Sequence, residues 1–376
     1  MTGEMPSSQG IEKGQESLSL HLTTPTESSL PVFVAGNFNG WRTGEEAFRM
    51  EKTGPGEYRF QFPNKYLLPR QLEYKYHRGD WDWAELDEYG NPPPNRKADV
   101  LKQEQCHDFV PRWMEEGRSY PLEFLPIPQV ISEQFEIPQL IKTRRISALL
   151  PYNYYQTDKR YPVLYLQDGQ NLFDDYAPFG NWAVDKKLAV MAERGMGDII
   201  IIAIDHAKEE RIAEFTPSYR TKLGTGEGKK YVRFLADTLK PYIDKTFRTL
   251  PERQNTGIGG SSMGALISIY AGLIYPEVYN KLMIFSPSLW VAPHIHFHFL
   301  NFQEPQDMDI YLYGGGEEGA NMIPNIRRFK QAFEEEGKAH IRFNLSTDPW
   351  GKHNEARWGE EFPKAMEWLF FQKKEA

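Results

Sequence analysis

One serine of this chain stands in a pattern typical of nucleophilic catalysis. Residues 260–264 read Gly-Ser-Ser-Met-Gly, a G-x-S-x-G motif centred on Ser262. The preceding NTGIGG predicts a short strand, and the following MGALISIYAGLIYPE has apolar side chains at close to helical spacing. A serine on a tight strand-to-helix turn projects its hydroxyl above the carboxyl edge of a sheet. This context favours Ser262 as a nucleophile over a plain turn, with the N–H of Met263 as an oxyanion donor.

A serine nucleophile needs a base to take its proton, and the chain offers a histidine in a suitable place. His353 lies in DPWGKHNEARWGE, a loop between the strand-like HIRFNL and the final helix. Such a loop can carry an imidazole over the edge of a sheet, so we predict that His353 is the base. His340 opens the strand itself and is interpreted as structural. The alternative for His353 is an ordinary histidine on a surface loop.

The acid that orients the histidine is expected between the serine and the base, after the strand DIYLYGG. The turn GGGEEG places two carboxylates there. Glu317 is the first choice, followed by Glu318 and then Asp348. A carboxylate at this place would hold the tautomer of the imidazole and stabilise its protonated form. Two adjacent glutamates in a loop are also consistent with solvated charges.

A second oxyanion donor is expected after an early strand. In VLYLQDGQNLFDD a hydrophobic strand ends at a glycine, which lets the backbone turn the N–H of Gln170 or of its neighbour toward the pocket. Asp168 and Asp174 lie beside it, but no clustered His or Glu completes a metal site, so none is predicted. In HIHFH the histidines alternate, and we interpret them as a pocket wall or lid rather than a metal site. They are His294, His296 and His298.

The elements needed to position these groups follow from the pattern of the chain. Up to about residue 108 the sequence predicts short strands separated by turns, as in a small antiparallel β-sandwich. Beyond residue 134 strands alternate with helices, which predicts a mostly parallel sheet flanked by helices. The expected division is a flexible N-terminus (1–18), a β-sandwich (19–108), a proline-rich ordered linker (109–133) and an α/β domain (134–376).

Composition limits the classes of partner. The formal net charge is −8 with no basic patch, which disfavours nucleic acid and anionic membranes. The single cysteine, Cys106, excludes an internal disulfide framework and is interpreted as a passive thiol. Neither a signal peptide nor a membrane-spanning stretch is evident, so a cytoplasmic location is expected unless a leader has been removed.

The region from about residue 144 to 370 resembles the esterase family of α/β-hydrolases, which includes enterochelin, feruloyl and acetyl xylan esterases, S-formylglutathione hydrolase and mycolyltransferases. The matching stretches are YPVLYLQDGQNLFD, AIDHAKEERIAEFTP, GGSSMGALIS, MIFSPSLW and GKHNEARW. The resemblance implies Ser262 as nucleophile, His353 as base, and N–H groups near Gln170 and Met263 as the oxyanion hole. Some members use a serine–histidine pair alone. RIAEFTP also matches a family pattern, and its Arg211 and Glu214 are interpreted as parts of a buried salt bridge.

Residues 30–96 resemble an immunoglobulin-like glycogen- or starch-binding module, on the stretches VFVAGNFNGW and LEYKYHRGDWDWAELDEYGNPPPNR. The resemblance implies that Trp41 and Trp81, with Trp83 as an alternative, stack on glucose units. Trp41 could equally belong to the core of a spacer domain. The extra tryptophan and the proline run depart from the pattern.

The function expected from these observations is that of a serine esterase that needs no cofactor. Its expected substrate is an acylated carbohydrate, with an acetyl or feruloyl group on a sugar or a polysaccharide such as a glucan. A siderophore ester is the alternative within the same class. A non-catalytic carbohydrate-binding or scaffold protein is the alternative from another class. The sequence does not indicate the acyl group or the oligomeric state.

Overall fold

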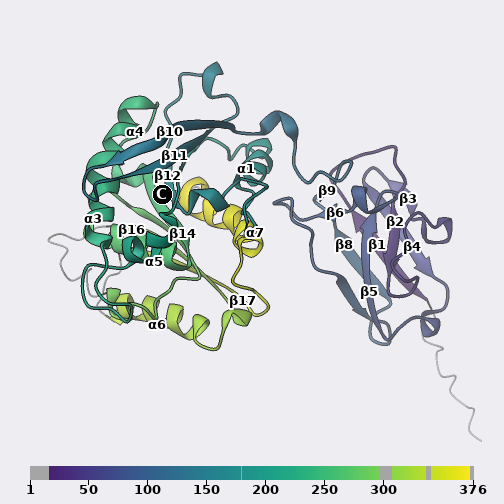
Figure 1. The fold of residues 1–376 in the computed structure, drawn as a ribbon. Coiled ribbons are helices and arrows are strands. Elements are labelled where there is room, and N and C mark those ends of the chain that lie inside the picture. The colour runs from purple at the N-terminus through teal and green to yellow at the C-terminus, as the bar shows by residue number, and fades with distance from the viewer. Residues whose placement is uncertain (1–16, 179, 297–306, 336–339, 373–376) are drawn as a thin grey trace, which may run out of the picture. The chain divides into compact units, whose positions relative to one another are not determined.

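The chain forms two compact units, residues 1–120 and residues 121–376, which are described separately (Figure 1). The computed structural model describes residues 17–178, 180–296, 307–335 and 340–372. The flexible N-terminus expected over residues 1–18 lies, except for its last two residues, outside this part. Within the described residues no helix is long and apolar enough to cross a membrane.

The first unit is a sandwich of short strands. A four-stranded sheet has the order β3-β4-β1-β8, a three-stranded sheet the order β2-β5-β7, and β6 pairs with β9. The strands are β1 (Leu18–Thr23), β2 (Phe33–Gly36), β3 (Glu51–Gly54), β4 (Glu57–Phe62), β5 (Gln71–His77), β6 (Glu85–Leu86), β7 (Arg96–Asp99), β8 (Gln105–Phe109) and β9 (Arg112–Trp113). One pairing differs from the purely antiparallel expectation, because β1 and β8 run parallel.

The two larger sheets of this unit share one hydrophobic core. Leu20 of β1 and Val34 of β2 belong to the same cluster, as does Tyr74 of β5. Cys106 also faces this core, and burial raises the pKa of its thiol. A thiol with a raised pKa is a poor nucleophile, in line with the passive role expected from the sequence.

The second unit is built on an eight-stranded sheet of order β10-β11-β13-β12-β14-β15-β16-β17. Its strands are β10 (Ile127–Ile137), β11 (Lys142–Leu150), β12 (Val163–Gln167), β13 (Ile200–Ile204), β14 (Thr256–Ser261), β15 (Lys281–Phe285), β16 (Met308–Gly315) and β17 (Ile341–Asp348). From β13 to β17 all neighbouring strands in this order are parallel. Strand β11 pairs antiparallel with both of its neighbours, β10 and β13. The expected mostly parallel sheet is confirmed.

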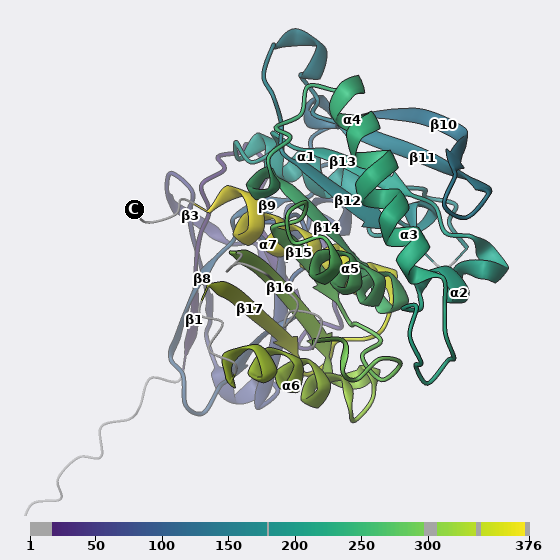
Figure 2. The same ribbon diagram turned by 90° about the vertical axis from the view of Figure 1, so that its left-hand side faces the viewer.

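Helices cover both faces of this sheet (Figures 1 and 2). They are α1 (Val184–Glu193), α2 (Arg211–Phe215), α3 (Gly228–Phe234), α4 (Lys240–Thr246), α5 (Ser262–Ile274), α6 (Met322–Glu335) and α7 (Glu355–Met366). Wider π-helical turns at Leu235–Leu239 and Glu367–Phe371 follow α3 and α7. The helices α3, α5 and α6 contribute to one core cluster, and α1 and α7 contribute to the other.

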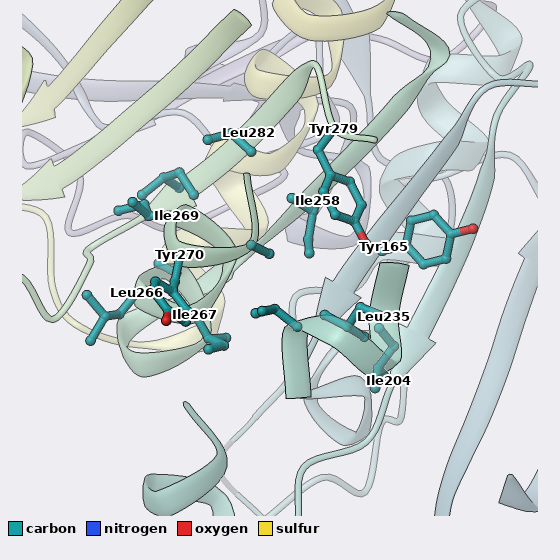
Figure 3. Packing of buried hydrophobic residues seen from close by; sticks show 14 of the residues in the cluster. Tyr165, Ile204, Leu235, Ile258, Leu266, Ile267, Ile269, Tyr270, Tyr279 and Leu282 are labelled. Carbon is teal, nitrogen blue, oxygen red and sulfur yellow. The ribbon is translucent and has the colours of Figure 1, made fainter. Parts of the chain in front are cut away.

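Successive strand residues alternate between these two clusters. Tyr165 of β12 and Leu266 of α5 belong to the cluster on one face (Figure 3), whereas Leu164 and Leu166 belong with residues of α1 and α7 to the cluster on the other. A strand buried on both faces needs apolar residues at every position. This requirement explains the unbroken Ile-rich run of β13 and the clean reading of that strand from the sequence.

The linker expected over residues 109–133 is shorter in the structure. Arg112–Trp113 forms β9 and pairs with β6, and β10 begins at Ile127 and pairs with β11. The boundary between the units falls at residues 120 and 121. Strand β10 was missed because it is an edge strand with alternating exposure, and its single proline, Pro128, argued against a strand.

Candidate active site

Four neighbouring parallel strands end at the same edge of the second sheet. In spatial order β14, β15, β16 and β17 are followed by Ser262, Ser286, Glu318 and His353. The carboxyl ends of parallel strands meet at one edge, which is where open α/β sheets hold their ligands. Residues spread over more than ninety positions of sequence are thereby gathered along one rim.

Ser262 lies at the turn between β14 and α5 in a left-handed backbone conformation, with φ of 55°. Such a φ is uncommon for a residue other than glycine and is a form of local strain. Neighbouring atoms closely approach both glycines of the motif. A Cβ on Gly264 would lie 2.8 Å from Oδ2 of Asp168, and one on Gly260 would lie 3.0 Å from the carbonyl carbon of Gly264. The structure therefore has the crowded strand-to-helix turn that the motif predicted.

His353 is paired with Glu318 rather than with Glu317. The distance from Nδ1 of His353 to Oε2 of Glu318 is 2.7 Å. Glu317 instead lies 3.8 Å from Nζ of Lys352, with a side chain that is 42% exposed. Asp348 accepts from the guanidinium of Arg357 at 2.9 Å. Of the three carboxylates weighed from the sequence, the second choice is the one that contacts the imidazole.

Glu318 is held by two further hydrogen bonds. Its Oε1 accepts from the N–H of Gly315 and from Oγ of Ser286, each at 2.7 Å, and its side chain is completely buried. The backbone bond is the return half of a capping box, in which a glutamate at the third helical position bonds to the N–H three residues earlier. The same spacing joins Gly314 to Glu317, so the turn sequence alone does not distinguish the two glutamates; the end of β16 at Gly315 makes Gly315 the N-cap and selects Glu318.

The course of the chain carries His353 toward the end of β14. Gly351 passes over the end of β16, because its carbonyl accepts from the N–H of Glu317 at 3.0 Å. Four residues later, Glu355 bonds to Asn171, in the loop that follows β12. Strands β14 and β15 lie between β12 and β16, so the chain from residue 351 to residue 355 crosses them.

The ring of His353 has a fixed neighbour in this crossing. It meets Trp358 edge to face, with 4.9 Å between the ring centroids. Nε1 of Trp358 donates to Oγ of Ser286, the hydroxyl that also bonds to Glu318. The histidine, its carboxylate and its aromatic neighbour are therefore connected through one buried serine directly after β15.

The loop expected to supply an oxyanion donor is anchored by side chains on both sides of Gly169. Asp168 has a left-handed φ of 57° and receives Nε and Nη2 of Arg211 at 2.6 and 2.7 Å. The side-chain amide of Gln170 makes two bonds to the backbone of His206, at 2.9 and 3.2 Å. The backbone N–H of Gln170 therefore lies on a loop that side-chain hydrogen bonds fix on both sides of Gly169. The Asp168–Arg211 pair was not predicted from the sequence.

Arg211 and Glu214 each form an ion pair, but with different partners, and only the pair of Glu214 is fully buried. Glu214 is fully buried and receives Nη2 of Arg144 at 2.7 and 2.9 Å, with Lys142 at 3.4 Å. Arg211 pairs with Asp168 as described above. A bidentate arginine–carboxylate pair adds directional specificity to its charge. The two residues of RIAEFTP that were interpreted as structural therefore fix two different places: Glu214 binds Arg144 of β11, and Arg211 binds Asp168 directly after β12.

A second carboxylate lies behind the same loop. Oδ1 of Asp205 would be 2.7 Å from a Cβ at position 169, so Gly169 is required here. Burial raises the pKa of Asp205 to about 6, although Arg145 and Arg144 act in the opposite direction. Asp205 follows β13 and lines a cleft of about 500 Å³ together with Gln170 and His206. The carboxyl group is partly protonated in mildly acidic solution.

The hydroxyl of Ser262 has a second serine as a neighbour. Oγ of Ser262 lies 3.3 Å from Oγ of Ser288, and the N–H of Ser288 donates to the carbonyl oxygen of Ser262 at 3.1 Å. Ser288 is 5% exposed. The turn after β15 is thereby tied to the elbow by a backbone bond and a side-chain bond.

The histidines of HIHFH are only partly within the described residues. His298 lies outside them, and the rings of His294 and His296 meet edge to face at 6.3 Å. The N–H of Ile295 bonds to the carbonyl of Ala292, so this part of the segment is a turn rather than an extended strand. His294 and His296 line a cavity of about 780 Å³. In the described part of the chain no group of three or more His, Cys, Asp or Glu residues could hold a metal ion.

In the first unit the structure brings two of the three expected sugar-binding tryptophans together. The rings of Trp41 and Trp81 have centroids 6.3 Å apart and are inclined by 45°. Trp81 is 38% exposed, and Trp41 has a left-handed φ of 61°. Trp83 ends the same short 3-10 turn as Trp81 and is half-buried.

Comparisons with known proteins agree with this arrangement. The family model described as "Putative esterase" matches residues 138–369. The uncharacterized protein YbbA of Bacillus subtilis is 26% identical over 243 residues, which cover 60% of this chain and 92% of YbbA. An endo-1,4-beta-xylanase/feruloyl esterase of Xylanibacter ruminicola is 25% identical over 211 residues, 52% of this chain and 26% of that protein.

Among solved structures, the siderophore hydrolase EstB from Aspergillus nidulans superimposes with a TM-score of 0.54 at 16% identity. The match covers 65% of this chain and 96% of EstB. A likeness at this identity concerns the fold of the second unit. The family model spans that unit from the loop before β11 into the C-terminal helical turn, Glu367–Phe371. On this match, and with the serine elbow and buried carboxylate–histidine pair in place, the chain belongs to the esterase family.

Proposed function

We propose that this protein is a serine carboxylic ester hydrolase that works through an acyl-enzyme. The observation that carries the proposal is the pair formed by His353 and the buried Glu318, held on the same sheet edge as the strained Ser262. A carboxylate on Nδ1 leaves Nε2 as the nitrogen free to act as a base. Membership of the esterase family supports the same class of reaction.

The proposed first step makes a bond between Ser262 and the substrate. Oγ of Ser262 attacks the ester carbonyl carbon while Nε2 of His353 takes the hydroxyl proton. Glu318 holds the imidazole in the required tautomer and stabilises the imidazolium that forms. The oxyanion is received by the N–H groups of Met263, at the start of α5, and of Gln170.

Collapse of this intermediate breaks the bond between the carbonyl carbon and the alcohol oxygen. His353 gives its proton to the leaving alcohol, and Ser262 is left acylated. Water then attacks the acyl group, with His353 again taking the proton, and the second collapse releases the acid and restores the serine. Every proton is accounted for by the imidazole, so the sequence of steps uses only groups of this chain and water.

The proposed substrate is an acylated carbohydrate, with a siderophore ester as the alternative. The X. ruminicola relative, a xylanase and feruloyl esterase, supports the first, and EstB, a siderophore hydrolase, corresponds to the second. A panel of acetylated and feruloylated sugars and a catechol siderophore would separate the two. A non-catalytic scaffold would hydrolyse none of them.

The test of the chemistry is hydrolysis of 4-nitrophenyl acetate by wild type and by Ser262→Ala. We expect a steady-state rate in wild type that falls to the solution background in the variant. Ser132→Ala, on the edge strand β10, provides a control serine variant that keeps Ser262 and its neighbours. Equal rates for wild type and Ser262→Ala would overturn the proposal.

We also propose that the first unit binds sugar through Trp41 and Trp81. The observation in favour is that two indole rings lie 6.3 Å apart, one of them exposed. Aromatic faces at a surface stack on the apolar faces of glucose rings. Affinity electrophoresis in amylose, glycogen and xylan would test this, with Trp350→Ala as a control tryptophan in the other unit. Unchanged retention of Trp41→Ala and Trp81→Ala would exclude these rings from a sugar site.

A further inference from the structure

A cavity of about 780 Å³ begins within a few residues of the proposed nucleophile. Leu289 and Trp290, which line it, directly follow Ser288, whose Oγ lies 3.3 Å from Oγ of Ser262. The N–H of Lys222 bonds to the carbonyl of Val291 at 3.0 Å and joins a third segment to this wall. Consecutive Cα atoms are about 3.8 Å apart, so the wall starts close to the serine.

Helix α6 forms the opposite wall through one stripe of its surface. The stripe residues follow one another at intervals of three or four, which places them on one face of a helix. They are Asn321, just before the helix, Asn325, Arg328, Ala332 and Glu335. The chain reaches this wall three residues after Glu318, so the cavity lies between the turns that follow β15 and β16.

The charged residues that line the cavity have a net positive charge. Lys222 and Arg328 supply two positive charges, and Glu335 supplies one negative charge. Elsewhere on α6 Lys330 pairs with Glu334. Among the ion pairs formed by described residues none involves Lys222 or Arg328; the guanidinium of Arg328 has a 3.5 Å contact with Oδ1 of Asn325. Two cations without a carboxylate partner in this part of the chain face one cavity.

The same cavity offers two aromatic rings. Trp290 is 50% exposed, whereas Phe329 on α6 is 4% exposed and packs into the core beneath the cavity. The half-exposed indole of Trp290 presents a flat apolar surface in the lining of the cavity. The lining therefore offers the indole of Trp290 to a flat apolar group and two positive charges to a carboxylate.

We infer that this cavity is the subsite for one half of the substrate and selects an ester whose acyl or alcohol part carries an anionic group on an extended or aromatic body. This inference rests on the proposed function, because it assigns a specificity to the same serine. An anion between Lys222 and Arg328 gains charge-assisted hydrogen bonds that a neutral isostere lacks. Trp290 covers the body of the group.

Two matched substrate pairs test the inference for either orientation of the ester. One pair is 4-nitrophenyl butanoate and mono-4-nitrophenyl succinate, which differ in an acyl-side carboxylate. The other is phenyl acetate and 4-carboxyphenyl acetate, which differ on the alcohol side. We expect wild type to have the higher kcat/KM for the anionic member of at least one pair. Correcting each value for the spontaneous hydrolysis rate removes the intrinsic difference between the esters.

The variants are Arg328→Gln and Lys222→Gln, with Arg327→Gln as the matched control, since Arg327 is adjacent on α6 but does not line the cavity. One charge-assisted bond corresponds to about a tenfold change. We expect the selectivity for the anionic ester to fall about tenfold in either cavity variant and to stay within twofold in the control. Arg327→Gln should leave the hydrolysis of both esters unchanged, and the quantity compared is the ratio of kcat/KM for the anionic and the neutral ester within each protein.

The outcomes separate the subsite from the chemistry. A selectivity equal in all four proteins, or a preference of wild type for the neutral members, would overturn the subsite while leaving the hydrolase intact. Should wild type hydrolyse no ester, calorimetric titration of Ser262→Ala with mono-4-nitrophenyl succinate and with 4-carboxyphenyl acetate still decides. Binding of either ester that is lost when Arg328→Gln is added would retain the subsite; no binding of either ester, or binding that Arg328→Gln does not weaken, would overturn it.

Discussion

Glu318 lies 2.7 Å from Nδ1 of His353, with its side chain completely enclosed by the protein. The neighbouring Glu317, which differs by a single position, is 42% exposed and 3.8 Å from Nζ of Lys352. Because the two carboxylates have the same chemistry and adjacent backbones, they form a natural matched pair for testing which one supports the base.

We expect Glu318→Gln to lower kcat for 4-nitrophenyl acetate by about 10²-fold or more and Glu317→Gln to change it less than twofold. A glutamine cannot stabilise the imidazolium and can present its amide to the wrong tautomer. The measurement is steady-state kinetics with active-site titration of each protein. Similar losses in both variants, or in neither, would remove Glu318 from the proposed triad.

The glycine after the serine is predicted to be irreplaceable. In Gly264→Ala the new Cβ would meet Oδ2 of Asp168 at 2.8 Å and Cβ of Gln167 at 3.0 Å. We expect a loss of about 1–3 kcal/mol in the free energy of unfolding, because overpacking must displace the strand end. Urea denaturation measures this loss. Gly54→Ala is the control, since its nearest contact at 3.0 Å is the mobile carboxylate of Glu57; equal effects of the two would contradict the crowding argument.

Arg211 is predicted to act as a positioning residue through Asp168. Arg211→Lys keeps the charge but loses the two-pronged contact at 2.6 and 2.7 Å. We expect kcat to fall about tenfold or more while the KM changes little, because a small displacement of the Gly169–Gln170 loop misplaces an oxyanion donor. Arg233→Lys, an exposed partner of Asp237, is the control. A change confined to the KM would assign Arg211 to substrate binding instead.

Asp205 predicts a pH dependence of stability. Burial raises its folded pKa from 3.8 to about 6, so between pH 4 and pH 6 the folded state binds more protons than the unfolded state. Stability then falls as the pH rises through this window, and the full cost is present above it. Asp205→Asn should therefore be about 1–3 kcal/mol more stable than wild type at pH 7 and equal to it below pH 4.

Urea titrations at pH 4, 5, 6 and 7 measure this difference. Asp198→Asn is the control, because Asp198 is 46% exposed and pairs with Lys159 at the surface. A difference between Asp205→Asn and wild type that does not vary with pH would show that the carboxyl group is not responsible.

The sequence by itself predicted the parallel strands of the second unit and the strand-to-helix turn at Ser262. Strands buried on both faces, such as β13, need apolar residues throughout and can therefore be recognised in the sequence. The elbow around Ser262 is equally local, because two glycines and a change of period from strand to helix lie within a few residues. Edge strand β10 was not predicted, because its alternation of polar and apolar residues and its proline are also typical of a linker.

The tertiary structure decided which carboxylate meets His353 and which arginine holds the loop before Gln170. Glu317 and Glu318 follow each other in a glycine-rich turn, and no periodicity distinguishes them. Only the fold-back bonds from Gly315 and Ser286 turn Glu318 inward. Asp168 and Arg211 are forty-three residues apart, and their pairing depends on how the loops after β12 and β13 pass one another. Contacts of this kind are set by the packing of distant segments, which local composition does not encode.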